Sequence, residues 1–556
     1  MKRILSTILF IAVAATATEA RQRTLAEMKN AAEKAIASAS ATPQNGGRSL
    51  NALKVLKSDT QLTLLGYENG GLAVIANDDA FSPVLGYTTG TYASDNHAPG
   101  FIWWLESMNK SLEQMLADGT QPVAVARAAS ERKAVAPLLT TKWGQDAPFN
   151  NLCPEYTDKN VTKRYITGCV ATAMAQVMNY HKYPVKGTGS YTHRFNGGNG
   201  TITVTANFGA TTYDWENMLD TYTEGQYSDT QAKAVATLML HCGIASQMNY
   251  SSTGSGTGNY KACNALKQYF NYHSNIKFYM REYTNEEEWM NIIYRELNDG
   301  CPIIYGGVTT SNAGHSFVLD GYDEHGLVSV NWGWNGYDNG YFDIAMLNGY
   351  SENQDMVVVR KPNDDRYTDI AQSLWSMSTP LYLTVSGTTL TLKENSFINF
   401  YETDFLDGFY GQLALVAKDE ATNEITVLKT INDEIFDYKV GNGFGISDYS
   451  GIQTNMLADG EYRVYVASIS ENEGDVWEPV RAKEDVRNSY MLTKTGNSIV
   501  LTEDPSSAWT GIDYVNKNEK GNAPTGVYTL DGRYAGENID DMPRGIYIYN
   551  GKKVVK

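Results

Sequence analysis

The sequence predicts an α+β protein in which two α+β regions are followed by an all-β region. Helix-type apolar spacing and strand-like apolar runs succeed one another as far as about residue 361. Beyond it, short alternating strands are separated by Asp-Gly and Gly-Asn turns, as in β-sandwiches. With 556 residues the chain is too long for one hydrophobic core, so several domains are expected.

The composition is that of globular domains, with 42% hydrophobic and 19% charged residues. The formal net charge of −18 argues against nucleic acid or an anionic membrane as the main partner, because both require basic surface. Ordinary solubility accounts for most of this charge. The sequence leaves the oligomeric state open.

Residues 1–20 have the pattern of a secretory signal peptide. Lys2 and Arg3 precede an apolar run from Ile4 to about Ala15, and small residues follow as far as Ala20. The run is too short to span a bilayer, and no other segment is apolar enough to do so. We therefore expect an exported protein without a membrane span.

Residues 21–132 form the first predicted domain. It starts with a helix, continues with alternating strands and ends with an amphipathic helix; these elements cover residues 25–36, 62–67, 72–76 and 101–116. Residues 124–133 are small, polar and basic, which is typical of an exposed linker that proteases cut.

Residues 133–361 form the second predicted domain. We expect helices at 169–182, 230–249, 259–272 and 285–299, and strands at 302–308, 315–322 and 327–332. The third domain, residues 362–525, is predicted to be sandwich-like, with strands at 381–385, 413–416 and 462–466. Residues 526–556 end in a hairpin-like pattern.

Cys169 is the candidate nucleophile. An apolar face at 170, 174, 177 and 178 predicts a helix that begins near it, and the free N–H groups of a helix start lower a thiol pKa. Gly168 leaves space for a substrate backbone. The chain has five cysteines, an odd number, so at least one thiol is free or pairs between chains. For a cysteine taken alone, a buried structural thiol is the commoner interpretation.

His315 is the candidate base. It precedes an apolar strand and follows Cys169 by roughly 146 positions, the order and spacing of papain-like proteases. Asn331 follows on a strand that can fold back antiparallel, where its amide oxygen would fix the imidazole tautomer. Trp332 would shield this hydrogen bond from water, although a purely structural core aromatic is equally consistent.

Gln145, 24 residues before Cys169, is a candidate oxyanion donor together with the N–H groups of the helix start. Taken alone, it would be interpreted as a solvent-exposed residue. The sequence has no HExxH motif and no CxxC pair, so we expect neither a metal site nor a cofactor.

At these residues the chain resembles the streptopain family of secreted papain-fold cysteine proteases. The resemblance covers about residues 25–360 and is carried by residues 168–173 (GCVATA), 180–184 (YHKYP), 314–321 (GHSFVLDG) and 330–336 (VNWGWNG). It implies catalytic roles for Cys169, His315, Asn331, Gln145 and Trp332. It also implies that Gly314 and the loop around Ser255 bind substrate.

The resemblance further implies a zymogen in which residues 21–132 act as an inhibitory propeptide. Its substrates would be proteins and peptides with a hydrophobic residue two positions before the scissile bond. The streptococcal type ends after the catalytic domain, whereas this chain continues for about 195 residues. The terminal segment resembles C-terminal sorting tails of secreted Bacteroidetes proteins, which implies either removal of the tail or attachment to the cell surface. A plain terminal β-hairpin is the alternative interpretation.

Two other functions remain open at this point. The β-rich C-terminal part favours a surface adhesin with a vestigial protease core, but such a protein has no need to keep Cys169, His315 and Asn331 together. A papain-fold amidase or transferase acting on cell wall or acyl groups is the third possibility. The propeptide-like first domain favours a protease, because an indiscriminate protease must stay silent until it is exported.

Overall fold

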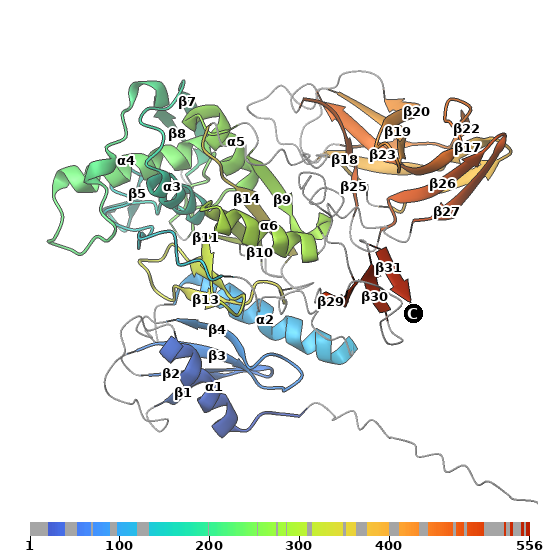
Figure 1. The fold of residues 1–556 in the computed structure, drawn as a ribbon. Helices are drawn as coiled ribbons and strands as arrows, with labels where there is room; N and C mark the ends of the chain where they lie inside the picture. Colours follow the sequence, from blue (N-terminus) through green and yellow to red (C-terminus); the bar gives the residue numbers. More distant parts are fainter. Residues whose placement is uncertain are drawn as a thin grey trace, which may run out of the picture. The chain divides into compact units, whose positions relative to one another are not determined.

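The computed structural model describes residues 21–38, 53–67, 70–88, 97–118, 133–197, 200–252, 254–273, 276–284, 286–308, 314–347, 352–362, 375–377, 379–399, 411–432, 443–470, 474–482, 486–504, 527–529, 534–536, 546–549 and 552–555 (Figure 1). The predicted signal peptide lies outside these residues, and so does nearly all of the predicted cleavable linker. Within them, no helix combines the length and apolar character needed to cross a membrane.

The chain forms two compact units, residues 1–92 with 112–122, and residues 93–111 with 123–556. The first unit contains a helix and a four-stranded antiparallel sheet, α1 (Leu25–Ser38), β1 (Lys54–Ser58), β2 (Leu62–Gly66), β3 (Leu72–Ala76) and β4 (Val84–Thr88). Every residue of β2 and β3 is buried, and α1 packs against β3 and β4. The helix and strands predicted here are therefore confirmed.

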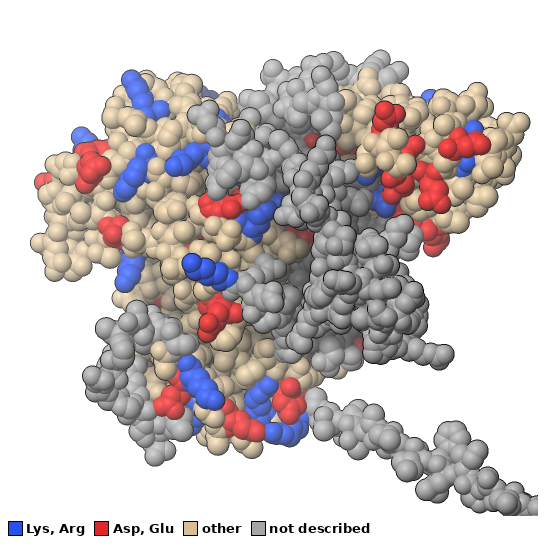
Figure 2. All heavy atoms as spheres, viewed as in Figure 1, with Lys and Arg blue, Asp and Glu red and all other residues tan. Residues whose placement is uncertain are grey.

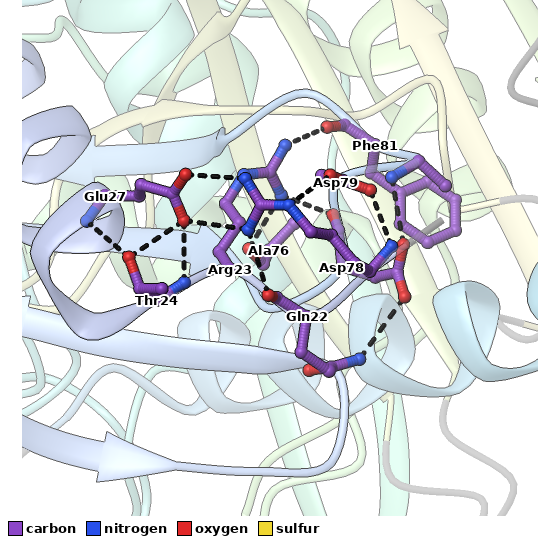
Figure 3. A network of polar contacts seen from close by, with 10 residues as sticks. Gln22, Arg23, Thr24, Glu27, Ala76, Asp78, Asp79 and Phe81 are labelled. Atoms are coloured by element: carbon purple, nitrogen blue, oxygen red, sulfur yellow. Dashed lines mark hydrogen bonds and ion pairs between the residues drawn. The ribbon is translucent and has the colours of Figure 1, made fainter. Parts of the chain in front are cut away.

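The start of the first unit is fixed by a polar network (Figure 3). The Arg23 guanidinium donates to the backbone carbonyls of Ala76 (2.9 Å), Asp78 and Phe81 (2.6 Å). The Thr24 hydroxyl caps α1, accepting from the Glu27 backbone N–H, while the Glu27 carboxylate accepts from the Thr24 N–H. One arginine thus satisfies three carbonyls of the turn that follows β3.

The catalytic region of the second unit is built on six antiparallel strands in the order β13-β12-β11-β10-β14-β9. Their bounds are β9 (Lys277–Met280), β10 (Ile303–Val308), β11 (Gly314–Tyr322), β12 (Val328–Asn331), β13 (Gly340–Phe342) and β14 (Glu352–Val358). Two hairpins lie outside this sheet, β5 (Glu155–Asp158) with β6 (Val161–Arg164), and β7 (Tyr191–Asn196) with β8 (Thr201–Ala206).

Helices cover this sheet and form the core with it. They are α3 (Cys169–His181), α4 (Asp229–Ala245), α5 (Asn259–Phe270) and α6 (Glu286–Asn298), all within a few residues of the predicted ranges. Ile304 of β10 joins the apolar core shared with α3, α4 and α5. The next residue, Tyr305, contacts Trp289 of α6, with 5.8 Å between ring centroids. Because side chains alternate along a strand, α6 covers the opposite face.

The second unit also contains the first part of α2 (Pro99–Asp118), because chain residues 93–111 belong to this unit. Phe101, Trp104 and Met108 of this helix are buried. The sequence analysis assigns this segment to the first predicted domain, residues 21–132. In the structure it belongs to the same compact unit as Cys169 and His315. A helix can leave its own domain when its apolar face finds a larger apolar surface elsewhere.

In the described residues the C-terminal region is all-β, as predicted. Its strands are β15 (Trp375–Met377), β16 (Leu383–Ser386), β17 (Thr389–Leu392), β18 (Asn395–Asn399), β19 (Gly411–Asp419), β20 (Ile425–Asn432), β21 (Gly443–Ile446), β22 (Tyr449–Gln453), β23 (Gly460–Ser470), β24 (Gly474–Pro479), β25 (Arg481–Ala482), β26 (Ser489–Thr495) and β27 (Ser498–Glu503). They form three sheets that share a main apolar core, and a smaller apolar cluster lies on β19 and β23. The predicted hairpin ending is present as β30 (Ile546–Tyr549) and β31 (Lys552–Val555), in a small sheet with β28 (Val527–Thr529) and β29 (Tyr534–Gly536).

Figure 2 shows basic and acidic side chains interspersed over the described part of the visible face. No continuous basic surface is visible on this described part of the face.

Candidate active site

Cys169 is the first residue of α3, as the apolar spacing predicts. Gly168 caps the helix with φ +90°, a left-handed conformation that favours glycine. A Cβ atom at Gly168 would also lie 2.6 Å from Met248 Sδ and 2.9 Å from the carbonyl oxygen of Ser255. Both backbone conformation and space therefore demand glycine directly before the cysteine.

The Cys169 thiol is partly buried, whereas the other four cysteines are buried, and none of the five forms a disulfide. Burial raises the pKa of the Cys169 thiol, and the backbone N–H groups of Ser316, Val170 and Cys169 act in the opposite direction. The Ser316 N–H belongs to β11, directly after His315. The thiol is therefore in contact with the strand that carries the candidate base.

His315 is the second residue of β11 and lies opposite Gly307 of β10. Its imidazole is partly buried and lies against α2, because a Cβ atom at Gly100 would lie 2.3 Å from His315 Cδ2. Burial lowers the pKa of His315 to about 4, and a hydrogen bond to the backbone of Trp332 partly offsets this effect. The Nε2 atom has no hydrogen-bond partner among the described residues.

Asn331 ends β12, and its side chain is fully engaged elsewhere. Its Oδ1 accepts from Gln176 Nε2 (3.3 Å) and from the Gly333 N–H (3.1 Å), and its Nδ2 donates to the Thr141 carbonyl (2.8 Å). The hydrogen bond that the sequence predicts between Asn331 and His315 is not formed among the described residues. Both the imidazole and the Trp332 ring instead lie close to Gly100 of α2.

Trp332 is completely buried beside His315. Its ring centroid lies 4.6 Å from that of Phe317 and 6.3 Å from that of Phe101, and its Nε1 donates to the Asp338 carbonyl (2.9 Å). The indole thus forms a rigid apolar wall next to the imidazole, which is compatible with the predicted shielding role.

Gln145 is buried, contrary to the solvent-exposed interpretation of a glutamine taken alone. Its backbone carbonyl accepts from the N–H of Thr167 (3.1 Å), two residues before Cys169. The loop that carries Gln145 is thereby tied to the segment that leads into α3.

Ser255 lies next to the start of the cysteine helix, and Gly314 begins the strand that carries His315. The carbonyl of Ser255 faces Gly168, and its hydroxyl donates to the Ile166 carbonyl (2.7 Å) and accepts from the Ser251 N–H (3.1 Å). Gly314 is exposed at the beginning of β11, opposite Val308. The Ser255 hydroxyl is occupied, so its backbone is the part available to a substrate.

Residues at the start of α2 contact the same region. Trp103 packs against Phe317 with tilted rings and 5.8 Å between ring centroids, and the Trp104 Nε1 donates to the Asp343 carbonyl (2.8 Å). The carboxylate of Asp338 accepts from the Ala98 N–H (2.7 Å) and lies 3.1 Å from Nδ1 of His97. Sequence reasoning gave His97 no role, because nothing local signals a partner more than 200 residues away.

Sequence reasoning also missed a set of polar residues behind Cys169, namely Asn259, Ser316 and Asp355. The available signal was a serine directly after the candidate base. The role of this serine depends on hydrogen-bond partners in two other elements, α5 and β14. Only the folded structure brings these elements together.

Comparison with known proteins identifies the family. Residues 143–342 match the model of the peptidase C10 family. The chain is 30% identical over 329 residues to streptopain of Streptococcus pyogenes, covering 56% of this chain and 82% of streptopain. It is also 30% identical over 319 residues to the thiol protease/hemagglutinin PrtT of Porphyromonas gingivalis, covering 53% of this chain but only 36% of PrtT.

Among solved structures, a fragment of prointerpain A from Prevotella intermedia is 43% identical with a TM-score of 0.49, covering 55% of this chain and 97% of that one. Active interpain A from the same organism is 48% identical with a TM-score of 0.37, covering 40% and 94%. The streptopain match extends over most of that relative at 30% identity. The chain therefore belongs to the peptidase C10 family, the cysteine peptidases that include streptopain.

Proposed function

We propose that this protein is a secreted cysteine endopeptidase made as a zymogen, with Cys169 as nucleophile and His315 as acid and base. The observation that carries the proposal is the position of the Cys169 thiol, at a helix start and against the backbone of the residue after His315. Helix N–H groups and an imidazolium both favour the thiolate, which is the reactive form.

In the proposed reaction, the Cys169 thiolate attacks the carbonyl carbon of the scissile peptide bond. The oxyanion is held by the Gln145 side-chain amide and the Cys169 backbone N–H. The His315 imidazolium then protonates the departing amine, which leaves a thioester on the sulfur. Finally, His315 takes a proton from water, which attacks the thioester and releases the acid and the thiol.

Latency is part of the proposal. With α2 against it, the His315 imidazole is hydrogen-bonded to neither the Cys169 thiol nor the Asn331 amide among the described residues. Removal of α2 would free the ring to reach both groups, with Trp332 shielding the bond to Asn331. The segment 21–132 would then be an inhibitor as well as a folding unit, and its linker near Arg132 the site of cleavage.

Substrate binding is proposed at the edges formed by Gly314 and the Ser255 loop, where exposed backbone can pair with an extended peptide. A preference for a hydrophobic residue two positions before the scissile bond is proposed from the resemblance to the streptopain family. Export is proposed from residues 1–20, and release or surface attachment would depend on the C-terminal tail.

The test of this function is hydrolysis of a denatured protein by the reduced full-length chain, with and without a thiol-directed inhibitor. We expect cleavage that the inhibitor stops, with the inhibitor located on Cys169 by peptide mass spectrometry. Binding of matrix proteins without any thiol reactivity would instead support the adhesin interpretation.

Replacing Gln145 by alanine is expected to lower kcat by about 10²–10³-fold while KM changes little, because an oxyanion donor acts in the transition state. Steady-state kinetics on a peptide substrate measure both constants. Asp146→Asn is the matched control, since Asp146 is the exposed neighbour in the same loop. A Gln145→Ala variant with the kcat of the control would remove Gln145 from the mechanism.

A further inference from the structure

A buried polar chain connects three elements behind the candidate nucleophile. The Ser316 hydroxyl of β11 donates to Asn259 Oδ1 (2.8 Å), and Asn259 Nδ2 donates to Asp355 Oδ1 of β14 (2.6 Å). Asn259 is the first residue of α5. Ser316 and Asn259 are 3% and 4% exposed, so solvent cannot replace these bonds.

This series of hydrogen-bonded side chains leads to the reacting sulfur. The backbone N–H of Ser316 faces the Cys169 thiol, and His315 is the preceding residue on the same strand. The side chain of Ser316 therefore anchors the backbone position from which that N–H points. A rotation of this peptide unit would move the N–H donor and the attachment point of the imidazole together.

The backbone of β10 is shaped to admit these side chains. A Cβ atom at Gly306 would lie 2.5 Å from Asn259 Nδ2, 3.2 Å from Asp355 Oδ1 and 3.2 Å from the His315 carbonyl oxygen. Glycine at this position lets the amide and the carboxyl pass close to the sheet. The residue opposite Gly306 on one side is Ser316, and on the other it is Asp355.

Apolar side chains would fill this space with a smaller loss of free energy, because each buried polar group must regain inside the protein the hydrogen bonds that it made to water. Burial raises the pKa of Asp355 to about 7, whereas the bond from Asn259 lowers it. A partly buried carboxyl that needs a dedicated amide packs a helix on a sheet less favourably than apolar side chains would. Its position behind the thiol suggests a more specific purpose.

We propose that Asn259 and Asp355 are positioning residues, which fix the Ser316 peptide unit and thereby the N–H group that stabilises the Cys169 thiolate. Asn259 bridges the other two groups, because its amide accepts from Ser316 and donates to Asp355. The inference rests on the proposed function of Cys169. It adds to that function a link from the nucleophile to α5, the helix that follows the Ser255 loop.

The experiment measures the rate at which iodoacetamide alkylates Cys169 in the reduced full-length chain as a function of pH, by peptide mass spectrometry. For Asn259→Ala we expect the profile to move up by about one pH unit, because a hydrogen bond to the charged sulfur is weakened. We also expect kcat for a peptide substrate to fall about tenfold, with KM within twofold of wild type. Gln268→Ala, at an exposed position of α5, is the control and should match wild type.

Conservative replacements separate positioning from general packing. Asp355→Asn keeps an oxygen that accepts from Asn259, so its profile should stay near wild type, whereas Asp355→Ala should resemble Asn259→Ala. The four buried cysteines report folding, because they should stay unlabelled in every variant used. If Asn259→Ala fails this check, Ser316→Ala removes only a hydroxyl and should shift the profile in the same direction.

An alkylation profile and kcat unchanged in folded Asn259→Ala or Ser316→Ala would overturn the inference. Equal impairment of Asp355→Asn and Asp355→Ala would also overturn it. These outcomes differ from a failure of the proposed function, in which the wild-type chain itself would neither hydrolyse the peptide nor be alkylated at Cys169.

Discussion

Replacing Cys169 by alanine is expected to reduce peptide hydrolysis by about 10⁴-fold or more, because no other group can form the thioester. The fold should survive, since the thiol is only partly buried and alanine suits a helix start. Initial rates on a denatured protein measure the loss, and thermal unfolding verifies the fold.

The control is Cys153→Ala, which removes a buried thiol outside the candidate site. It should keep activity within a few-fold of wild type, at a stability cost of about 1 kcal/mol for the lost packing. Comparable hydrolysis by the Cys169→Ala and Cys153→Ala variants would refute the nucleophile assignment.

Replacing Gly100 by leucine is the second large expected effect. A Cβ atom at this position would lie 2.3 Å from His315 Cδ2 and 2.7 Å from Trp332 Cε3. The Trp332 ring is completely buried and cannot move aside, so the start of α2 must leave the imidazole. The full-length chain should then convert to the mature form at least about tenfold faster than wild type. Weakening the contact between α2 and the imidazole by about 1.4 kcal/mol already raises the fraction of molecules with α2 released tenfold.

The rate of maturation is followed by gel densitometry after reduction, beside a Glu106→Leu control. Glu106 is exposed on the same helix, so this variant adds the same side chain without touching the site. Unchanged maturation of Gly100→Leu, in a chain whose near-ultraviolet circular dichroism shows intact packing, would argue against α2 as the element that keeps the enzyme latent.

Local patterns were sufficient to predict helices α3 to α6 and strands β10, β11 and β12, whereas β9, β13, β14 and the two hairpins were not predicted. The apolar face of the cysteine helix places its first residue at Cys169, and the strands around His315 and Asn331 were found from their apolar runs. These signals are local because helix and strand periodicity are properties of neighbouring residues. The order of cysteine, histidine and asparagine then indicated the chemistry.

The contacts of the site could not be predicted in this way, because they join distant segments. The position of Gly100 against His315 links residues more than 200 positions apart, and no pattern in α2 distinguishes that glycine. The bonds of Asn331 to Gln176 and Thr141 likewise depend on how a loop packs on α3. In the full-length chain these bonds of Asn331 take the place of the hydrogen bond to His315 that the order of catalytic residues predicts.

The most direct test of a self-maturing cysteine peptidase is the intact mass of purified wild-type and Cys169→Ala chains, followed over time under reducing conditions. We expect only the wild type to lose the segment that ends near Arg132, with the Cys169→Ala chain staying full length. If both chains stay full length and the wild-type thiol does not react with a thiol-directed inhibitor, Cys169 is not a catalytic nucleophile.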